Sequence, residues 1–384
     1  MNRVLPASVK PSICFLIDYM IVGGVEKVVC DAVDYLHDKF DITIFTFSGV
    51  APEIRERLGA KAEILVHPVS AKKQKLMAIP FLGGALIRHT VRKHYDFMIV
   101  LRSRLIMASQ SKSADSIIFW NHSDKDMMYA EPHKLGLFRK VNWLRLMTAY
   151  RKYDAIWVIN DLIRDKIQTG FKPKRVVTLE NPINCQDIRQ KSMAPADREL
   201  FLQDGLNFVV VSRLSAEKAV DRTIIAMSEI ARTVHCKLII VGDGPARKTL
   251  EEYVVSHGLE GNVSFVGTKA NPYPYMKQAD LVILPSKTES FGLVILEAMM
   301  LHTPILASDT VGSRFLLNNG EYGILTENSA EGILSGMKRF IECPNTYREN
   351  TYAAYSYAQT FDIKAFTKKL TRLLDKTHPV EDEN

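Results

Sequence analysis

The chain has 384 residues, which is too long for one ordinary domain and fits two domains of about 150–200 residues each. Its 47% apolar and 24% charged residues exclude a disordered or fibrous protein. The formal net charge is +7, and residues 70–152 carry the excess, with 16 Lys or Arg against five Asp or Glu. Such a region predicts an anionic partner: a lipid surface, a nucleic acid or a phosphorylated substrate.

The longest apolar stretches, 77–87 and 291–301, are too short to span a bilayer, which takes about 20 residues. The first 20 residues lack the apolar core and cleavage site of a signal peptide, so we expect a cytoplasmic protein. Five dispersed cysteines without a CxxC pair predict reduced thiols rather than a disulfide framework or a zinc site.

Short apolar runs alternate with segments of helical periodicity in the first half of the chain. Strands are expected at 13–17, 41–47, 97–100, 116–120 and 155–159, and helices at 25–37, 80–94 and 137–152. This alternation is typical of an open parallel α/β sheet. We therefore expect a first domain at 1–183.

A polar segment at 184–205 follows a turn-forming Asn-Pro pair and predicts a linker. A second series follows at 206–360, with strands expected at 207–211, 237–241, 263–266, 281–284 and 304–307. The fold class is thus α/β, with two doubly wound Rossmann-like domains facing a cleft. Ligands of such sheets lie beyond the carboxyl ends of the strands, where the motifs below are found.

Glycines follow two of the expected strands. Gly23 and Gly24 precede the first helix, where small residues let backbone N–H groups approach a phosphate. A turn that only links strand to helix explains them equally well. Gly242, within VGDGP, permits a close ligand contact or, again, an ordinary strand-to-helix turn. The chain has neither a GxGxxG fingerprint nor a GxxxxGK[ST] loop.

Arg213 and Lys218 follow the strand at 207–211, within SRLSAEKAVD. Two cations at a strand end can clamp a diphosphate and neutralise its charge as it leaves. The alternative is a pair of surface cations, with Lys218 bonded to Glu217 or Asp221. For an arbitrary loop this alternative is the better explanation.

The segment 279–300, ADLVILPSKTESFGLVILEAMM, carries the most specific pattern. Glu289 stands in a loop before a helix and Glu297 eight residues later within it, so that both can face one ligand. The helix start offers backbone N–H groups to a phosphate, those of Ser290, Phe291 and Gly292. Apolar residues surround Glu297, so ribose hydroxyls would satisfy its carboxylate. A position on the solvent edge of the helix is the alternative.

His122 follows the strand at 116–120, where it can donate a hydrogen bond to a sugar hydroxyl or to the acceptor. A lone His is more often a structural residue. Asp124-Lys125-Asp126 formally reads DxD, a pattern by which some sugar-nucleotide enzymes hold a divalent metal. It does not directly follow a strand, and we interpret it as a coincidental surface loop.

Cations flank apolar residues twice within 70–152. One group surrounds the apolar stretch 76–86 and consists of Lys72, Lys73, Lys75, Arg88, Arg92 and Lys93. The other group runs from Lys134 to Lys152 around Trp143. This pattern favours an interfacial contact with an anionic membrane. Solvated helix faces are the alternative. Nucleic-acid binding is a third explanation, but no stacking platform or known binding motif supports it.

Together these segments resemble the retaining GT-B glycosyltransferases of family 4, most strongly over 207–325. ESFGLVILE is similar to the family's E-x7-E motif, SRLSAEKAVD to its Arg…Glu-Lys segment, VGDGP to its glycine turn and GGVE to its first-domain loop. HTPILAS and YGILT match the closing stretches of its second domain. Ala219 and His302 stand where the family usually has Gly, and we expect altered local shape there rather than lost activity.

The resemblance implies a role for each matching position. Arg213 and Lys218 would bind the donor diphosphate, and Glu297 would hold the ribose. Glu289 would contact the donor sugar, and His122 would lie near the reacting centre. The remaining donor contacts would come from Gly24 in the first domain and from Gly242, Ser290, Phe291, Gly292 and Leu293 in the second. The final helix, 361–376, would pack back on the first domain.

The implied reaction is transfer of a hexose, with retention, from a nucleotide sugar such as a UDP-sugar. The acceptor would be a hydroxyl of a glycan or lipid-linked oligosaccharide in surface polysaccharide or lipopolysaccharide synthesis. Neither a metal nor another cofactor is expected, and the enzyme would act peripherally at the inner face of the cytoplasmic membrane. Two alternatives are a GT-B-fold sugar-nucleotide epimerase or phosphorylase, and a catalytically idle binding subunit of a glycan assembly complex.

Overall fold

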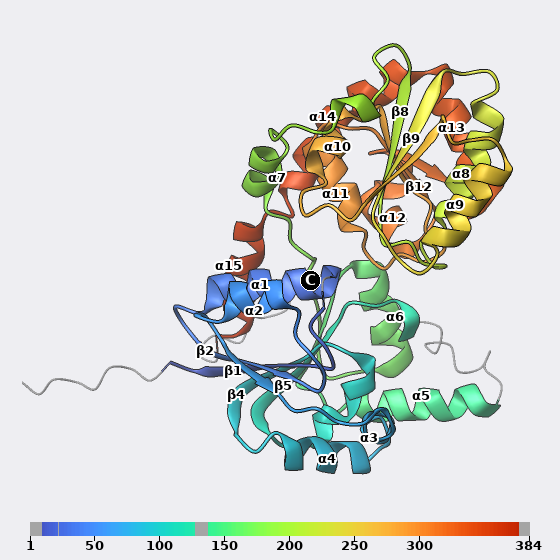
Figure 1. Cartoon of the computed structure of the whole chain (residues 1–384). Helices are drawn as coiled ribbons and strands as arrows, with labels where there is room; N and C mark the ends of the chain where they lie inside the picture. Colours follow the sequence, from blue (N-terminus) through green and yellow to red (C-terminus); the bar gives the residue numbers. More distant parts are fainter. Residues whose placement is uncertain (1–9, 22, 127–136, 376–384) are drawn as a thin grey trace, which may run out of the picture. The chain divides into compact units, whose positions relative to one another are not determined.

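The computed structural model describes residues 10–21, 23–126 and 137–375, which form two compact units (Figure 1). Unit 1 comprises residues 1–181 and 364–384, and unit 2 comprises residues 182–363. Each unit contains one parallel sheet with connecting helices, which confirms the predicted fold class. No helix within the described ranges is both long enough and apolar enough to cross a bilayer.

Unit 1 is built on seven parallel strands in the order β3-β2-β1-β4-β5-β6-β7. Its central strands are runs of buried apolar residues, as expected for strands covered on both faces. The strands are β1 Ser12–Ile17, β2 Asp41–Thr46, β3 Glu63–Val66, β4 Tyr95–Val100, β5 Ala114–Asn121, β6 Ala155–Val158 and β7 Val176–Thr178. The helices are α1 Gly24–Leu36, α2 Pro52–Leu58, α3 Ala71–Leu76, α4 Leu82–Thr90, η1 Ser103–Gln110, α5 Leu137–Tyr150, α6 Asp161–Phe171 and α15 Ile363–Leu373.

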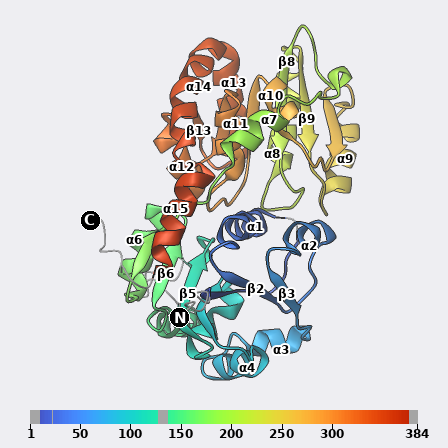
Figure 2. The same cartoon turned by 90° about the vertical axis from the view of Figure 1, so that its left-hand side faces the viewer.

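Helix α15 returns to unit 1 although it follows unit 2 in the sequence (Figure 2). The ring of Phe366 stacks on Trp120, with 5.9 Å between ring centroids. Lys369 Nζ lies 3.1 Å from Glu180 Oε2. A buried aromatic contact and a surface ion pair therefore hold the last helix on this sheet.

Unit 2 has six parallel strands in the order β10-β9-β8-β11-β12-β13. The strands are β8 Leu206–Val211, β9 Cys236–Val241, β10 Val263–Gly267, β11 Leu281–Leu284, β12 Ile305–Ser308 and β13 Ile324–Thr326. The helices are α7 Cys185–Lys191, η4 Arg198–Leu200, α8 Val220–Ile230, α9 Arg247–Ser256, α10 Tyr273–Gln278, α11 Leu293–Met300, α12 Val311–Leu316, η5 Asn318–Gly320, α13 Ala330–Glu342 and α14 Pro344–Gln359. One continuous apolar core joins β8, β9 and β11 to α8 and α13.

Residues 184–205, predicted as a linker, belong to unit 2. The Asn184 side chain caps α7 by accepting a hydrogen bond from the Asp187 N–H, and α7 packs against α10 and α11. Asn271 Nδ2 donates to the Lys191 carbonyl, 2.8 Å away. The polar composition of this segment thus belongs to the exposed side of a packed helix rather than to a free connection.

Candidate active site

The strand order of each sheet contains one switch point, where successive connections leave in opposite directions. It lies between β1 and β4 in unit 1 and between β8 and β11 in unit 2. In such sheets, ligands bind at the carboxyl ends of the strands beside this point. Arg213 and Lys218 follow β8, and Glu289 follows β11. The two loops are tied together, because the Lys287 N–H donates to the Glu217 carbonyl at 2.8 Å.

Lys218 and Glu289, both predicted site residues, meet in unit 2. Lys218 Nζ lies 2.6 Å from Glu289 Oε2, and their side chains are 25% and 15% exposed. In the described part of the chain, Lys218 makes this pair rather than one with Glu217 or Asp221. A cation and a carboxylate are therefore held at the switch point with partial access to solvent.

Arg213 is placed differently. Its side chain is 63% exposed and pairs with Glu217, with 2.6 Å between Nη2 and Oε1. This is the surface-cation arrangement that the sequence left open. Exposed ion pairs contribute about 0–1 kcal/mol to stability, so Arg213 would lose little free energy by exchanging Glu217 for a diphosphate oxygen.

The start of α11 is shaped by two glycines. Gly292 has φ 93° and ψ 62°, a left-handed conformation that turns the chain into the helix. A Cβ on Gly312 would lie 2.5 Å from the Phe291 nitrogen, and the Gly312 N–H donates to the Glu289 carbonyl at 2.8 Å. Helix α12 therefore supports the loop that carries Glu289, Ser290 and Phe291 from behind.

Glu297 lies within α11 with only 7% of its surface exposed, so the solvent-edge alternative is wrong. Tyr273 Oη donates a hydrogen bond to its Oε1 at 3.3 Å. The carboxylate is thus buried among apolar residues but not without a donor. Whether ribose hydroxyls also bind it stays a prediction.

A clamp made by Arg222 was not predicted. Its guanidinium donates to the Pro285 carbonyl at 3.2 Å and to Asn328 Oδ1 at 2.6 Å. Asn328 Nδ2 donates in turn to the Lys287 carbonyl at 2.9 Å. These bonds fix the loop after β11, but their partners are 41 to 106 residues apart in the sequence, so no local pattern reveals them.

Two serines with buried hydroxyls flank the switch point of unit 2. Ser212 directly follows β8 and Ser286 comes two residues after β11, and neither Oγ has a hydrogen-bond partner within the described ranges. A buried hydroxyl without a partner is uncommon and calls for an explanation such as a ligand or ordered water. The only sequence signal for them is a serine just after each strand.

Gly242 has φ 147°, and a Cβ there would lie 1.9 Å from the Ser212 carbonyl oxygen. Contact between the backbones that follow β8 and β9 therefore explains this glycine without a ligand. Ala219 and His302 have φ 49° and 54°. Both residues therefore have a left-handed backbone, which costs a residue other than glycine about 1–2 kcal/mol. The expectation of altered local shape at these two positions stays a prediction.

In unit 1, Gly23 precedes α1, which begins at Gly24. A Cβ on Gly23 would lie 2.6 Å from Glu26 Oε2, so the close approach here is to the protein's own carboxylate. Glu26 is buried and hydrogen-bonded to Arg102 Nη2, and Arg102 Nε lies 3.5 Å from Asp18 Oδ1. Burial raises the pKa of Asp18 and of Glu26, and Arg102 opposes that rise. An ion cluster therefore occupies the switch point of this sheet.

His122 directly follows β5, and its ring lies 4.7 Å from that of Trp120. Burial, followed by the nearby charge of Arg102, lowers the pKa of His122 to about 3. Asn181 lies beside the ring without hydrogen-bond geometry, so both ring nitrogens are buried without a hydrogen-bond partner in the described ranges. At neutral pH the side chain is an uncharged imidazole whose hydrogen-bonding atoms are unused.

The DxD segment is not a surface loop throughout. Asp126 is buried and accepts hydrogen bonds from Tyr150 Oη at 2.9 Å and Ser103 Oγ at 3.4 Å. It braces α5 against η1, so the surface-loop interpretation is wrong for this residue. Among the described residues, no three or more His, Cys, Asp or Glu side chains are grouped so as to hold a metal.

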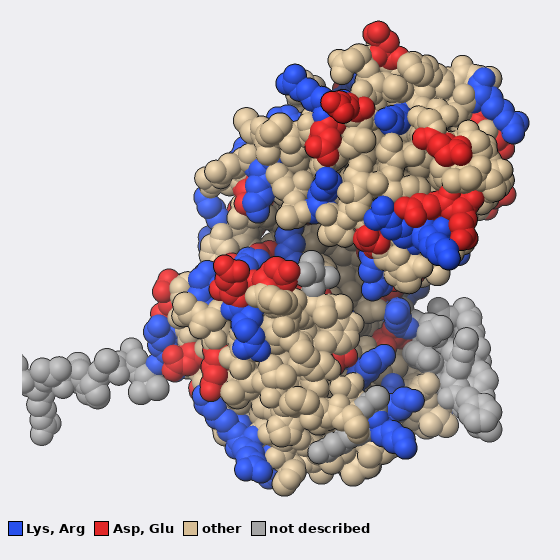
Figure 3. Space-filling view, viewed as in Figure 1, with Lys and Arg blue, Asp and Glu red and all other residues tan. Residues whose placement is uncertain are grey.

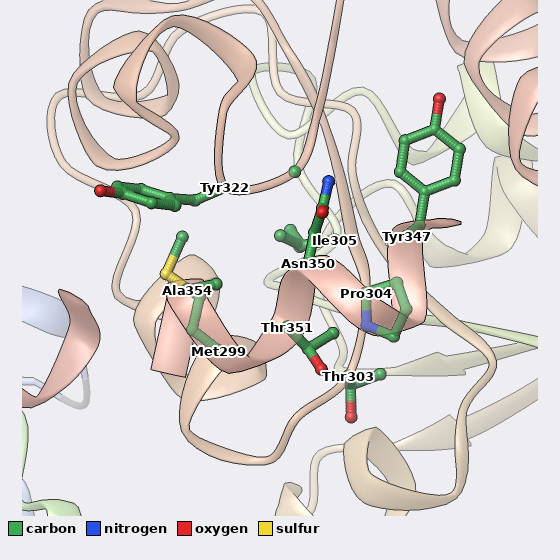
Figure 4. Close-up of a pocket in the computed structure, with 10 residues that line it drawn as sticks. Met299, Thr303, Pro304, Ile305, Tyr322, Tyr347, Asn350, Thr351 and Ala354 are labelled. Carbon is green, nitrogen blue, oxygen red and sulfur yellow. The ribbon is translucent and has the colours of Figure 1, made fainter. Parts of the chain in front are cut away.

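A small pocket in unit 2 lies between α11, α14 and the start of β12 (Figure 4). Met299, Tyr322, Tyr347 and Asn350 are among its lining residues, and none of the lining residues is charged. None of the predicted site residues lines it, so it contributes nothing to the site described above.

Two family models match the chain. Glycosyltransferase Family 4 matches residues 22–187, and Glycosyl transferases group 1 matches residues 196–357. The structure of Anabaena HepE in complex with UDP and glucose is similar over 95% of this chain and 99% of that one, with a TM-score of 0.74 and 20% identity. The structure of WaaG, a glycosyltransferase involved in lipopolysaccharide biosynthesis, covers 95% of this chain and 100% of its own, with a TM-score of 0.71 and 17% identity.

Curated relatives extend the comparison. The alpha-D-kanosaminyltransferase of Streptomyces kanamyceticus is 32% identical over 51% of this chain and 54% of its own length. The chain spans about half the length of the first curated relatives that it matches. A Campylobacter jejuni N-acetylgalactosaminyltransferase that acts on a diphospho-undecaprenol glycan is 23% identical over 88% of this chain and 93% of its own. The two models and the two sheets together show that the chain belongs to glycosyltransferase family 4 (glycosyl transferases group 1) and has the GT-B fold.

Proposed function

We propose that this protein is a retaining glycosyltransferase that takes a hexose from a nucleotide sugar, specifically a UDP-sugar. The observation that carries the proposal is the meeting of Lys218, Glu289 and the start of α11 at the switch point of unit 2. HepE, whose structure contains UDP and glucose, supports the choice of donor.

The chemistry follows from the donors at this point. An ammonium has three N–H groups, and Glu289 uses one of those on Lys218, which leaves two for diphosphate oxygens. The N-terminal end of α11 adds backbone N–H groups and the positive end of the helix dipole. Negative charge grows on the diphosphate as the sugar C–O bond breaks, and these groups stabilise it. We therefore propose that transfer proceeds without a metal or other cofactor.

Retention is proposed to come from departure and attack on the same face of the sugar, with the leaving diphosphate accepting the proton of the acceptor hydroxyl. Arg213 would bind the diphosphate together with Lys218 once its guanidinium releases Glu217, and Glu297 would bind the ribose. Gly24 and His122 are proposed to contact the substrates from unit 1. The neutral His122 imidazole would act as a hydrogen-bonding group rather than as a charge.

The acceptor is proposed to be a hydroxyl of a lipid-linked oligosaccharide in cell-surface polysaccharide synthesis. The Campylobacter relative, which by name acts on a diphospho-undecaprenol glycan, supports this class. The basic region 70–152 supports a position at the inner face of the cytoplasmic membrane, with the protein peripheral to anionic lipid.

The test begins with thermal shifts against UDP-, GDP- and ADP-sugars and continues with donor turnover in EDTA. We expect a UDP-sugar to stabilise the protein and to be consumed without a metal. NMR of the transferred sugar should show the donor's anomeric configuration. Lys218→Ala should reduce turnover by about two orders of magnitude, and Lys248→Ala, which removes an 89% exposed lysine, should not.

Other outcomes would contradict the proposal. Epimerised UDP-sugar in the absence of any acceptor would indicate an epimerase, and a phosphate-dependent release of sugar phosphate would indicate a phosphorylase. Nucleotide binding without transfer or donor hydrolysis would indicate an idle binding subunit.

A further inference from the structure

The turn between α3 and α4 exposes an unusual number of apolar side chains. Phe81 is 74% exposed, and Leu76, Ile79 and Leu82 are 41%, 44% and 43% exposed. Figures 1 and 2 show α3 and α4 together at one end of unit 1. Four large apolar residues are thus exposed within seven positions of the chain, and soluble proteins rarely leave large apolar patches uncovered.

The turn is firmly built. Phe81 has φ 63° and ψ −52°, and the Leu82 N–H donates to the Pro80 carbonyl at 2.7 Å, so Phe81 is the centre of a γ-turn. This turn is rare and strained for an L-residue. A Cβ on Gly83 would lie 2.1 Å from the Met77 carbonyl oxygen, and the Phe81 N–H donates to Gln110 Oε1 at 2.8 Å. The helix predicted at 80–94 consequently starts only at Leu82.

The strained turn holds the large Phe81 ring in solvent, where the ring adds nothing to the packing of the core. Strain of this kind points to a function that needs the ring in that position. Lys152 Nζ lies 5.4 Å from the centre of the ring, which adds a cation to the exposed aromatic face.

A second exposed apolar face borders the turn. Val141 and Leu144 of α5 are 61% and 50% exposed. Arg145 Nη1 donates to the Ala78 carbonyl at 3.2 Å, and residues three or four positions apart share one side of a helix. The side of α5 that carries Val141 therefore adjoins the α3–α4 turn. We call these six residues the elbow patch: Leu76, Ile79, Phe81, Leu82, Val141 and Leu144.

The two segments that carry the elbow patch have charges of one sign. Residues 71–94 and 137–152 hold six and five Lys or Arg and no Asp or Glu. Lys72, Lys75, Arg88, Lys140 and Lys152 are all exposed. Figure 3 shows Lys and Arg side chains on this end of unit 1, on either side of uncharged surface. Lys134, part of the predicted basic group, lies outside the described residues.

We propose that the elbow patch inserts into the headgroup region of an anionic bilayer, with the Phe81 ring as the deepest group and the surrounding cations on lipid phosphates. An aromatic and aliphatic surface ringed by cations matches both layers of such an interface. An acidic protein would match the cations but would not need an aromatic ring held out by strain. This inference deepens the membrane contact proposed above and rests on it.

The test uses the full chain and sedimentation with phosphatidylcholine vesicles, with or without 30 mol% phosphatidylglycerol. We expect salt-sensitive binding to the anionic vesicles only. Phe81→Gly removes the ring and suits the positive φ, so the variant should stay folded and bind about tenfold more weakly. Replacing Lys72, Lys75 and Lys152 together by Gln should weaken binding at least as much. Met193→Gly, which alters a residue of unit 2 that is 77% exposed, should bind like the wild type.

Several results would overturn the proposal. One is wild-type binding to neutral vesicles as strong as to anionic ones, and another is unchanged binding by Phe81→Gly. Retention on polyglutamate beads that depends equally on Phe81 would indicate an acidic protein partner instead. Hydrolysis of a soluble UDP-sugar should be the same in Phe81→Gly and the wild type. If the protein does not bind vesicles, the transferase proposal is therefore unaffected. If neither Phe81→Gly nor the wild type hydrolyses the UDP-sugar, the result of the vesicle assay still stands.

Discussion

Arg102 offers the sharpest test of how unit 1 is held together. Its guanidinium is the cation closest to two carboxylates, Asp18 and Glu26, whose residues are 4% and 3% exposed. Arg102→Met keeps the length and much of the apolar bulk but leaves both carboxylates without that cation. Breaking a buried ion pair from one side destabilises a protein by about 3–5 kcal/mol. Each kcal/mol lowers the Tm of a unit of this size by about 2–4 °C, so we expect a loss of about 6–20 °C.

The loss should depend on pH. Burial raises the pKa of Asp18 and of Glu26 in the folded protein, while Arg102 lowers both. A carboxyl group with a raised folded pKa favours folding while it is protonated, below its unfolded pKa, and this stability is lost as pH rises through the folded value. Without Arg102 the folded pKa values rise further. The Tm deficit of Arg102→Met should therefore be small near pH 4 and should grow as the pH is raised to 8.

Calorimetry at pH 4.5, 6.5 and 8 measures both effects, with the unit 1 transition followed separately from that of unit 2. Arg55→Met is the matched control, because Arg55 is an exposed arginine of the same unit and is not among the charges that shift the pKa of Asp18 or Glu26. Its effect should stay within about 0.5 kcal/mol. A Tm deficit for Arg102→Met below 2 °C at pH 8, or a large deficit that does not change with pH, would refute the reasoning.

Three further predictions concern the site residues. Glu297→Ala should weaken UDP binding by about tenfold or more in calorimetric titration, whereas a loss of stability with unchanged affinity would assign Glu297 to packing with Tyr273. Ala219→Gly should leave the free energy of unfolding unchanged or raise it by up to about 1 kcal/mol, since it relieves a left-handed alanine; clear destabilisation in urea melts would contradict this. His122 has its pKa lowered to about 3, so the stability it contributes above pH 6.5 is lost as pH falls toward that value. His122→Asn should accordingly lose less stability than the wild type between pH 6.5 and 4, and equal losses would exclude His122 as the cause.

The sequence predicts the central strands well because they are continuous apolar runs with polar ends. β11, for example, occupies the predicted 281–284. The sequence does not predict the outer strands β3, β7 and β13, which have only three or four residues each. β3 also has no buried residue. Strands this short show no periodicity and are defined by pairing with a neighbouring strand. The helix expected at 80–94 is shortened by the γ-turn at Phe81, which depends on contacts with Met77 and Gln110.

The site was predictable only as separate segments. Lys218 and Glu289 are 71 residues apart and meet because β8 and β11 are neighbours, an arrangement that depends on strand order rather than on either motif. The hydrogen-bond partners of Arg222 lie 63 and 106 residues away, and Glu26, the hydrogen-bond partner of Arg102, lies 76 residues away. Local patterns identify chemically suitable residues, whereas the topology decides which of them meet.

The two switch points suit different tasks, although each holds a cation beside carboxylates. Arg102 contacts Glu26 and Asp18 and also lies over the Tyr19 ring, 4.7 Å away. A diphosphate there would have to displace the buried side chains of Asp18 and Glu26 from the guanidinium. Lys218 contacts one carboxylate that is 15% exposed and that lies on the loop leading into the positive end of α11. A diphosphate at Lys218 would therefore bind a partly exposed ammonium beside a helix N-terminus, whereas a diphosphate at Arg102 would break buried ion pairs. This difference is why we propose that the leaving group lies in unit 2.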